Sequence, residues 1–188
     1  MNFELLTLNL AQAAADEADF LLVLVPDAFK PERGVLSQMI DDALKAGELE
    51  SKAGKLLPAW RVTGVAAPRL ILAGAGDGSA RQVRAALLSA MASVKAASAR
   101  RLTVCFTAAC SGHVLRAAML AIAEATYVYT TTQSKPEGRN LRSVRMGVPD
   151  SVTLADAFAQ GAAVVAGIEL AKEWANRPAN HATPSLLA

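Results

Sequence analysis

Short apolar runs alternate with stretches of helical periodicity along most of this chain. Three of the runs are typical of buried strands, at 19–26, 69–73 and 102–106, and the first of them is continuous, lies between two turn signals and is typical of a strand covered on both faces. A mixture of apolar and polar positions predicts two further strands, a half-buried one at 2–10 and another at 141–148. The pattern therefore predicts a sheet whose central strands are buried.

Helical periodicity fills most of the intervals between these strands. Four helices are predicted, at 34–46, 80–97, 111–125 and 153–175. Ser79 or Asp77 can cap the second of them. A weaker strand at 55–63 contains Pro58, so we expect it at a sheet edge or a bulge. The order β-β-α-β-β-α-β-α-β-α predicts an α/β fold, a three-layer α/β/α sandwich around a mixed, mainly parallel sheet.

The last predicted helix is longer than a small domain needs. Its approximate length of 23 residues corresponds to roughly 35 Å, and the segment that follows it, 176–178, contains a proline that stops it. A long helix that leads into such a segment favours a strut between two domains. The chain ends at Ala188 with no turn, cap or charged tail, so we expect the polypeptide to continue into a neighbouring domain.

Composition narrows the class of protein. The chain has 188 residues, of which 53% are hydrophobic and 19% charged, which excludes a disordered tail, a collagen-like fibre and a disulfide scaffold. Its two cysteines, Cys105 and Cys110, have neither metal-site nor Cys-x-x-Cys spacing. The longest apolar run, 157–171, is too short for a membrane span and contains Gln160. We expect a cytoplasmic protein without a membrane partner.

Charge is unevenly distributed along the chain. Residues 1–60 carry 5 Lys or Arg and 10 Asp or Glu, whereas residues 61–145 carry 12 and 3. The basic middle makes nonspecific nucleic-acid contact a hypothesis, with candidate residues Arg81, Arg84, Arg100, Arg101, Arg139, Arg142 and Arg145. The alternative is that these arginines solvate helix faces and strand ends. Aromatic residues for base stacking are scarce, with only Tyr127 and Tyr129 nearby.

A glycine-rich turn is the one candidate ligand loop. Gly74, Gly76 and Gly78 lie between a predicted strand and a helix start, where N–H groups favour anions. The turn matches neither G-x-G-x-x-G nor a P-loop, so a bare glycine turn is the alternative. The two histidines, His113 and His181, lack ligand-spaced partners. We therefore expect no metal site, no cofactor and no catalytic residue within this chain.

The end of the chain carries the most specific motif. Residues 169–188 read ELAKEWANRPANHATPSLLA, which resembles the start of the catalytic domain of leucyl aminopeptidases, the cytosol aminopeptidases of peptidase family M17. In that family the linking helix ends in a pattern like A-R-x-L-x-N-x-P-x-N-x-x-T-P-x-x-L-A. The matching positions are Asn176, Pro178, Asn180, Thr183, Pro184, Leu187 and Ala188. Lys172 stands where the family usually has Arg, and Trp174 where an aliphatic residue is common.

The resemblance implies a two-domain enzyme that releases N-terminal amino acids from peptides. On this view residues 1–150 form a macro-domain-like N-terminal domain, 151–176 an interdomain linking helix, and 177–188 the start of the catalytic peptidase domain. The family's two divalent metals, Zn or Mn, and its catalytic residues lie in that second domain. Its signature N-T-D-A-E-G-R-L is absent here, so the chain alone is expected to be inactive.

The resemblance also implies partners. Family members are homohexamers, and some bacterial members bind DNA, so the expected partners are the catalytic domain, further copies, peptide substrates and candidate DNA. The N-terminal domain would serve assembly and regulation. Two alternatives remain open from the sequence: a stand-alone macro-like module that binds a nucleotide or ADP-ribose, and a nonspecific DNA-binding domain.

Overall fold

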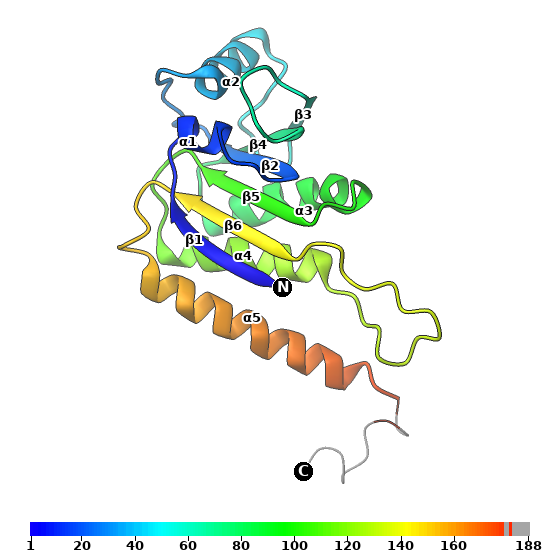
Figure 1. Ribbon diagram of the computed structural model, residues 1–188. Coiled ribbons are helices and arrows are strands. Elements are labelled where there is room, and N and C mark those ends of the chain that lie inside the picture. The colour runs from blue at the N-terminus through cyan, green and yellow to red at the C-terminus, as the bar shows by residue number, and fades with distance from the viewer. Residues whose placement is uncertain (179–180, 182–188) are drawn as a thin grey trace.

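The computed structural model describes residues 1–178 and residue 181. Within these residues the strands are β1 (Asn2–Thr7), β2 (Phe20–Pro26), β3 (Leu56–Trp60), β4 (Arg69–Gly76), β5 (Arg101–Phe106) and β6 (Ser143–Val148). The helices are α1 (Leu10–Ala14), α2 (Val35–Ala46), α3 (Ala80–Ala96), α4 (Gly112–Thr126) and α5 (Ala155–Ala175). The predicted α/β class is confirmed, with a long C-terminal helix (Figure 1).

The strands of the described chain form one mixed sheet in the order β1-β6-β5-β2-β4-β3. Every neighbouring pair is parallel except β3 and β4, which are antiparallel at one edge. Every residue of β2 is buried, as its continuous apolar run predicted. The sheet is therefore mainly parallel, with one antiparallel strand, β3, at its edge.

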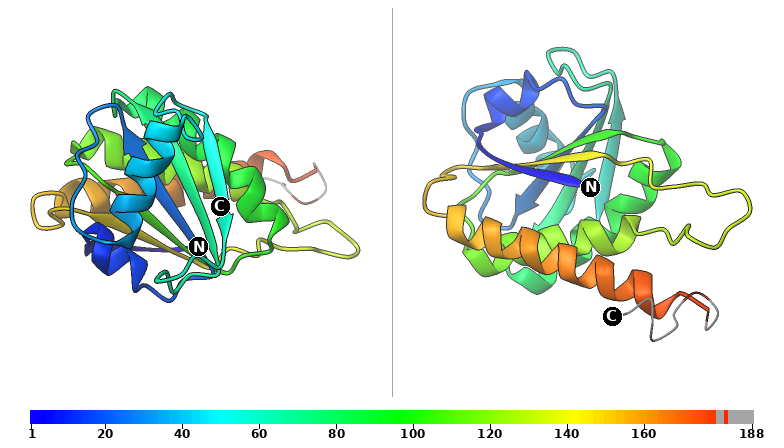
Figure 2. Two further views of the ribbon diagram at one scale, coloured as in Figure 1. Left: turned by 90° about the horizontal axis from the view of Figure 1, so that it is seen from above. Right: turned by 60° about the horizontal axis from the view of Figure 1, so that its bottom comes forward.

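Helices cover both faces of the sheet (Figure 2). Two apolar cores lie between the sheet and these helices, one on each face. Successive side chains of a strand point to opposite faces, so Leu22 and Leu24 join the core beneath α3 and α4. Leu21 and Val23 join the core beneath α1 and α2. The continuous apolar run of β2 is therefore used twice, once on each face, and this explains why it shows no alternation.

Pro58 occupies a position on β3 where its missing N–H faces away from the sheet. Two backbone bonds set the register, because the Gly74 N–H donates to the Lys55 carbonyl at 2.9 Å and the Arg61 N–H donates to the Pro68 carbonyl at 3.0 Å. Hydrogen-bonded positions alternate along an antiparallel strand, so Pro58 lies out of phase with them. The expected edge position of this strand is confirmed.

The first strand is shorter than the sequence pattern predicted. It ends at Thr7, and α1 follows directly, so the expectation of a strand through residue 10 was wrong. Asn9 and Gln12 form a capping box, in which the Asn9 Oδ1 accepts from the Gln12 N–H at 2.8 Å and the Gln12 Oε1 accepts from the Asn9 N–H at 2.9 Å. These two bonds satisfy backbone N–H groups at the start of α1. Leu10, the first residue of this helix, is buried in the core beneath α1 and α2.

The first half of α5 packs closely against α4. Gly161 and Val165 are buried there, and an added Cβ on Gly161 would lie 2.8 Å from the sulfur of Met119. Leu154 and Val165 belong to the same core as α3 and α4, so the apolar core continues past residue 150. Among the described helices, none is both long enough and apolar enough to span a bilayer.

Candidate functional site

The carboxyl ends of the parallel strands are the place where open α/β sheets usually bind ligands. Gly74, Gly76 and Gly78 lie there, at the end of β4 and just after it. Their N–H groups already donate to the carbonyl oxygens of Lys55, Ser51 and Ala75, at 2.9, 2.7 and 3.0 Å respectively. An anion at this turn would have to displace those backbone bonds. Anion binding here stays a prediction.

A close backbone approach accounts for the first of these glycines. A Cβ on Gly74 would lie no more than 2.6 Å from the carbonyl oxygens of three consecutive residues, Glu50, Ser51 and Lys52. Real Cβ atoms essentially never come so near to backbone atoms, so only glycine fits at this position. The glycine-turn alternative therefore explains Gly74 without a ligand.

The same rim carries negative charge at a helix start. The Asp77 Oδ1 accepts a hydrogen bond from the Ser79 N–H at 2.8 Å, just before the first turn of α3. Hydrogen bonds from the side chain and the N–H of Ser79 lower the pKa of Asp77. A carboxylate is therefore held where an anionic ligand would meet the helix dipole. The electrostatics of this rim do not favour a phosphate group.

A hollow of about 380 Å³ opens nearby, beside the carboxyl ends of β1, β5 and β6. Several polar side chains on its wall are already engaged. Asn9 and Gln12 bond to each other's backbone, and the Thr107 hydroxyl donates to the Leu24 carbonyl at 2.8 Å. Lys30 and Glu32 add opposite charges. The hollow has room for a small molecule, but these groups do not converge on one as a catalytic set would.

No metal-binding or thiol centre is assembled in the described residues. They contain no group of three His, Cys, Asp or Glu side chains placed to hold a metal ion. Burial raises the pKa of Cys105 to about 12 and that of Cys110 to about 11, so both thiols stay protonated at neutral pH. The hydroxyl of Ser111 accepts from the Val114 N–H at 3.4 Å and caps α4.

The candidate arginines are largely occupied by partners of their own. In the described part of the chain, ion pairs join Arg84 to Glu124, Arg101 to Asp19, Arg139 to Glu169, and Arg145 to both Asp16 and Glu4. The ion pairs of Arg145 link β6 to β1 and to the turn after α1. Each pair reduces the positive charge available to a phosphate backbone.

The remaining candidate arginines lie at opposite ends of the domain. Arg81 lies in the first turn of α3, next to the carboxyl edge of the sheet. Arg100 and Arg142 lie at the amino edge, where the Arg142 N–H donates to the Arg100 carbonyl at 2.8 Å. The structure therefore does not bring the seven arginines together at one edge of the sheet. Nucleic-acid contact stays a prediction, and the solvated-face alternative agrees better with this arrangement.

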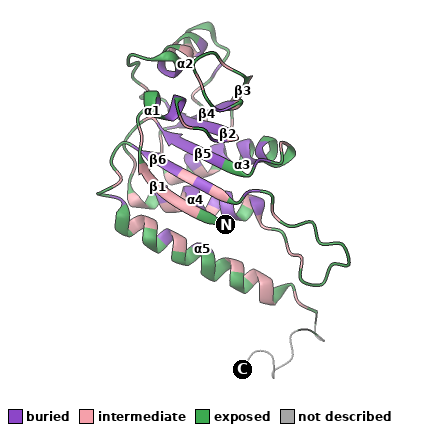
Figure 3. Ribbon diagram, viewed as in Figure 1, coloured by how far each residue is buried: buried purple, intermediate pink, exposed green. Residues whose placement is uncertain are grey.

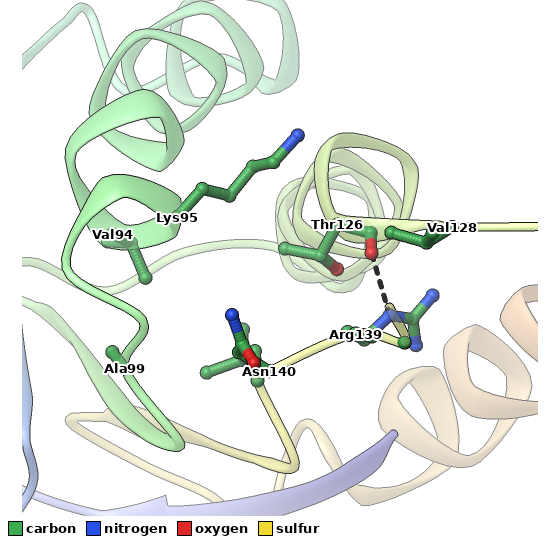
Figure 4. Close-up of a pocket in the computed structure, with 9 residues that line it drawn as sticks. Val94, Lys95, Ala99, Thr126, Val128, Arg139 and Asn140 are labelled. Atoms are coloured by element: carbon green, nitrogen blue, oxygen red, sulfur yellow. Dashed lines mark hydrogen bonds between the residues drawn. The ribbon is translucent and has the colours of Figure 1, made fainter. Parts of the chain in front are cut away.

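The amino edge of the sheet holds a small hollow of about 100 Å³, beside Arg139 (Figure 4). The Arg139 Nε–H donates to the Thr126 carbonyl at 2.9 Å, at the carboxyl end of α4. A cation is favourable at that end of a helix. Lys95 and Asn140 border the same hollow. Arg139 therefore has a structural role, since it caps one helix and pairs with another.

The segment 127–142 fastens the carboxyl end of α5 to the domain. Arg139 pairs with Glu169, and their side chains are only 15% and 27% exposed. The Thr131 hydroxyl donates to the carboxylate of Glu173, and the amine of Lys172 lies 5.2 Å from the ring centre of Tyr127. Periodicity did not predict these contacts, and their local signal is the spacing of Glu169, Lys172 and Glu173 on the last turns of the helix.

The structure describes only part of the interdomain signature that the motif at the end of the chain predicts, namely Asn176, Pro178, Asn180, Thr183 and Pro184. Asn176 ends α5, where its Nδ2 donates to the Lys172 carbonyl at 2.7 Å. Pro178 follows and cannot continue the helix. Asn180, Thr183 and Pro184 lie outside the described residues. An interdomain role for these positions stays a prediction.

The strands and helices form a three-layer α/β domain, and its described residues contain no group of three His, Cys, Asp or Glu side chains placed to hold a metal ion. Comparison with known proteins gives the family. The profile of the cytosol aminopeptidase family, N-terminal domain, matches residues 27–136. This chain belongs to the cytosol aminopeptidase family, peptidase family M17, and corresponds to its N-terminal domain.

Curated relatives agree along the whole chain. It is 54% identical to a probable cytosol aminopeptidase of Verminephrobacter eiseniae, covering all of this chain and 36% of that protein. It is 51% identical to the probable cytosol aminopeptidase of Albidiferax ferrireducens, covering all of this chain and 39% of that one. The chain thus spans less than two fifths of the length of these relatives.

Solved structures share the fold. A mutant of tomato leucine aminopeptidase matches with a TM-score of 0.74 at 18% identity, over all of this chain and 40% of that one. The bottromycin maturation enzyme BotP, in complex with Mn, matches with a TM-score of 0.62 at 22% identity, over 90% of this chain and 34% of that one. At such identities the likeness shows the fold alone.

Proposed function

We propose that this chain is the non-catalytic N-terminal domain of a leucyl aminopeptidase, which releases N-terminal amino acids from peptides. The observation that carries the proposal is the match of the whole chain to 36% of a probable cytosol aminopeptidase. The remaining length of such relatives offers room for a catalytic domain in the same polypeptide. We place this enzyme in the cytoplasm.

The chemistry of the enzyme would lie outside this chain. Two-metal hydrolysis needs clustered carboxylate, histidine or similar ligands, and the described residues contain no such group. The described residues therefore do not fit a pair of Zn or Mn ions, and no step of the reaction is assigned to them. The proposed role of this domain is to support assembly and regulation of the enzyme, which we propose is a homohexamer.

We propose the division 1–150 for the N-terminal domain, 151–176 for the linking helix and 177–188 for the start of the catalytic domain. The packing of α5 supports a rigid attachment of that helix, because Leu154 and Val165 share the core of the domain. A helix that is packed into the core of a domain cannot swing freely, so its orientation relative to that domain is fixed. The helix would therefore fix where the catalytic domain begins.

A direct test compares the chain with the longer polypeptide that the proposal implies. Both are purified, loaded with Mn²⁺ or Zn²⁺, and assayed for hydrolysis of leucine p-nitroanilide, with size-exclusion chromatography and light scattering for oligomeric state. We expect metal-dependent activity and a hexamer from the longer protein, and no activity from residues 1–188. Activity from residues 1–188, or an inactive longer protein under both metals, would refute the proposal.

The two alternative functions receive less support from the geometry. The N–H groups of the glycine turn are occupied and Asp77 is negatively charged, which does not favour a nucleotide or ADP-ribose. The candidate arginines are divided between two ends of the domain and several ion pairs, which does not favour a DNA-binding face.

A further inference from the structure

The packing of α5 against α4 changes along the helix. In the amino half the two helices lie close together, because a Cβ on Gly112 would lie 2.5 Å from the Cβ of Ala157. A Cβ on Gly161 would likewise lie 2.8 Å from the sulfur of Met119. Val165 is the last buried residue of α5, and the residues that follow it in the helix are half-buried or exposed (Figure 3). The contact between the helices therefore loosens toward their carboxyl ends.

A hollow of about 240 Å³ opens where the contact loosens. Its apolar walls are formed by Leu120 and Ala123 of α4 and by Val165 and Ile168 of α5. Residues three apart share one side of a helix, so these two pairs lie on the sides of α4 and α5 that face each other. Ile168 is 41% exposed on this inner side. The hollow thus explains why a large apolar side chain between two helices is in contact with solvent.

Four charged side chains border the same hollow, and three of them are neutralised. Arg84 and Glu124 pair with each other at 2.7 Å, and Glu169 pairs with Arg139. The fourth, Lys172, has no ion-pair partner in the described part of the chain. The wall therefore combines aliphatic surface with one positive charge that no carboxylate balances.

We propose that this hollow binds a small, branched apolar molecule that carries one carboxylate. The aliphatic walls take the apolar body, and the amine of Lys172 pairs with the carboxylate. Drug-sized ligands occupy pockets of about 300–1,000 Å³, so this ligand is smaller. At about 30 Å³ per water the hollow has room for about eight waters, and so for a molecule of roughly that number of non-hydrogen atoms. An amino acid such as leucine and a monocarboxylate such as isocaproate share this chemistry.

The inference is tested by titration of the isotope-labelled chain, residues 1–188, with amide chemical shifts as the readout. The probes are leucine, isocaproate, leucinamide, which lacks the carboxylate, and glycine, which lacks the apolar body. We expect leucine, isocaproate or both to shift the amides of 120–124 and 165–172 saturably, with a Kd on the order of 1 mM. Leucinamide and glycine should not do so. The tighter of the two carboxylates distinguishes an amino-acid source from a simple acid.

Two substitutions with matched controls test the position of the ligand. Ile168→Trp should fill the hollow and abolish binding, whereas Leu170→Trp should not, because Leu170 is 60% exposed and lies about 200° round the helix from Ile168. Lys172→Gln should weaken carboxylate binding about three- to tenfold. Lys95→Gln, in the last turn of α3, should leave it unchanged. Circular dichroism reports whether each variant is folded.

Several results would overturn the inference. One is the absence of saturable shifts with both carboxylates at about ten times the expected Kd. Another is binding of leucinamide as tight as that of leucine, and a third is binding that Ile168→Trp leaves unchanged. If Ile168→Trp does not fold, Lys172→Gln decides, since an unchanged Kd for the carboxylate would remove the proposed pairing. Binding is measured without the aminopeptidase assay, so its outcome is independent of the proposed function.

Discussion

Replacement of Gly74 by alanine tests the packing that we derive for the carboxyl rim. The added Cβ would lie no more than 2.6 Å from the carbonyl oxygens of Glu50, Ser51 and Lys52. These are backbone atoms, so the clash cannot be relieved by rotation of a side chain. The segment would have to move away from β4, and that movement would strain the bonds that it forms with the strand, including the one from the Gly76 N–H to the Ser51 carbonyl.

The expected cost follows from the number of atoms that clash. Overpacking typically costs about 1–3 kcal/mol, and three backbone oxygens place Gly74→Ala at the upper end, about 3 kcal/mol. For a chain of this size 1 kcal/mol shifts Tm by about 2–4 °C, so the expected fall is about 6–12 °C. Gly78→Ala is the matched control, because its φ of +74° strains alanine while no atom lies within 4 Å of the added Cβ. Its expected cost is about 1–2 kcal/mol.

The assay is thermal unfolding of the two variants and the parent chain, followed by circular dichroism with a reversibility check. Gly74→Ala should unfold at the lowest temperature and Gly78→Ala between it and the parent. If Gly74→Ala keeps the parent Tm, or falls by less than Gly78→Ala, the close approach of residues 50–52 is refuted. The glycine turn would then be open to a ligand explanation again.

Two further predictions concern titratable groups. Burial raises the pKa of Asp19, but hydrogen bonds from the N–H groups of Arg100 and Arg101 and from the Arg101 guanidinium outweigh it and lower that pKa below the ordinary 3.8. The stability that this carboxylate contributes is therefore present above its pKa in the unfolded chain and is lost as pH falls through its pKa in the folded chain. Asp19→Asn should thus flatten the decline of Tm between about pH 5 and pH 2. An unchanged decline would contradict this prediction. Because burial raises the pKa of Cys105 to about 12 and of Cys110 to about 11, a thiol reagent at about pH 8 should label both slowly in the folded chain and fast in urea. Fast labelling of the folded protein would contradict the burial of Cys105 and the partial burial of Cys110.

Most of the fold could be predicted from periodicity because the buried strands β2, β4 and β5 are almost wholly apolar. The run at 19–26 became the buried β2, and Pro58 correctly indicated the edge strand. The failure at α1 has a local cause, since the helix has only five residues and too few turns to show a period. Its capping pair, Asn9 and Gln12, was the available signal.

The candidate site could be predicted less well, because its residues act through neighbours that are distant in sequence. Gly74 looks like part of an anion loop until residues 50–52 are placed over it. Arg145 looks like a free cation until Asp16 is found 2.6 Å away, far along the chain. Local spacing carries no information on such contacts, since they depend on how the sheet is assembled.

The sequence alone determined the kind of fold, the edge position of Pro58 and the family, because periodicity, a missing N–H and a terminal motif are local properties of the chain. Only the tertiary structure decided which charges are free and what α5 does. It paired the arginines across the domain and fixed the carboxyl half of α5 to the segment 127–142. The reason is physical: electrostatic and packing energies depend on distances between groups, and folding sets those distances for residues far apart in sequence.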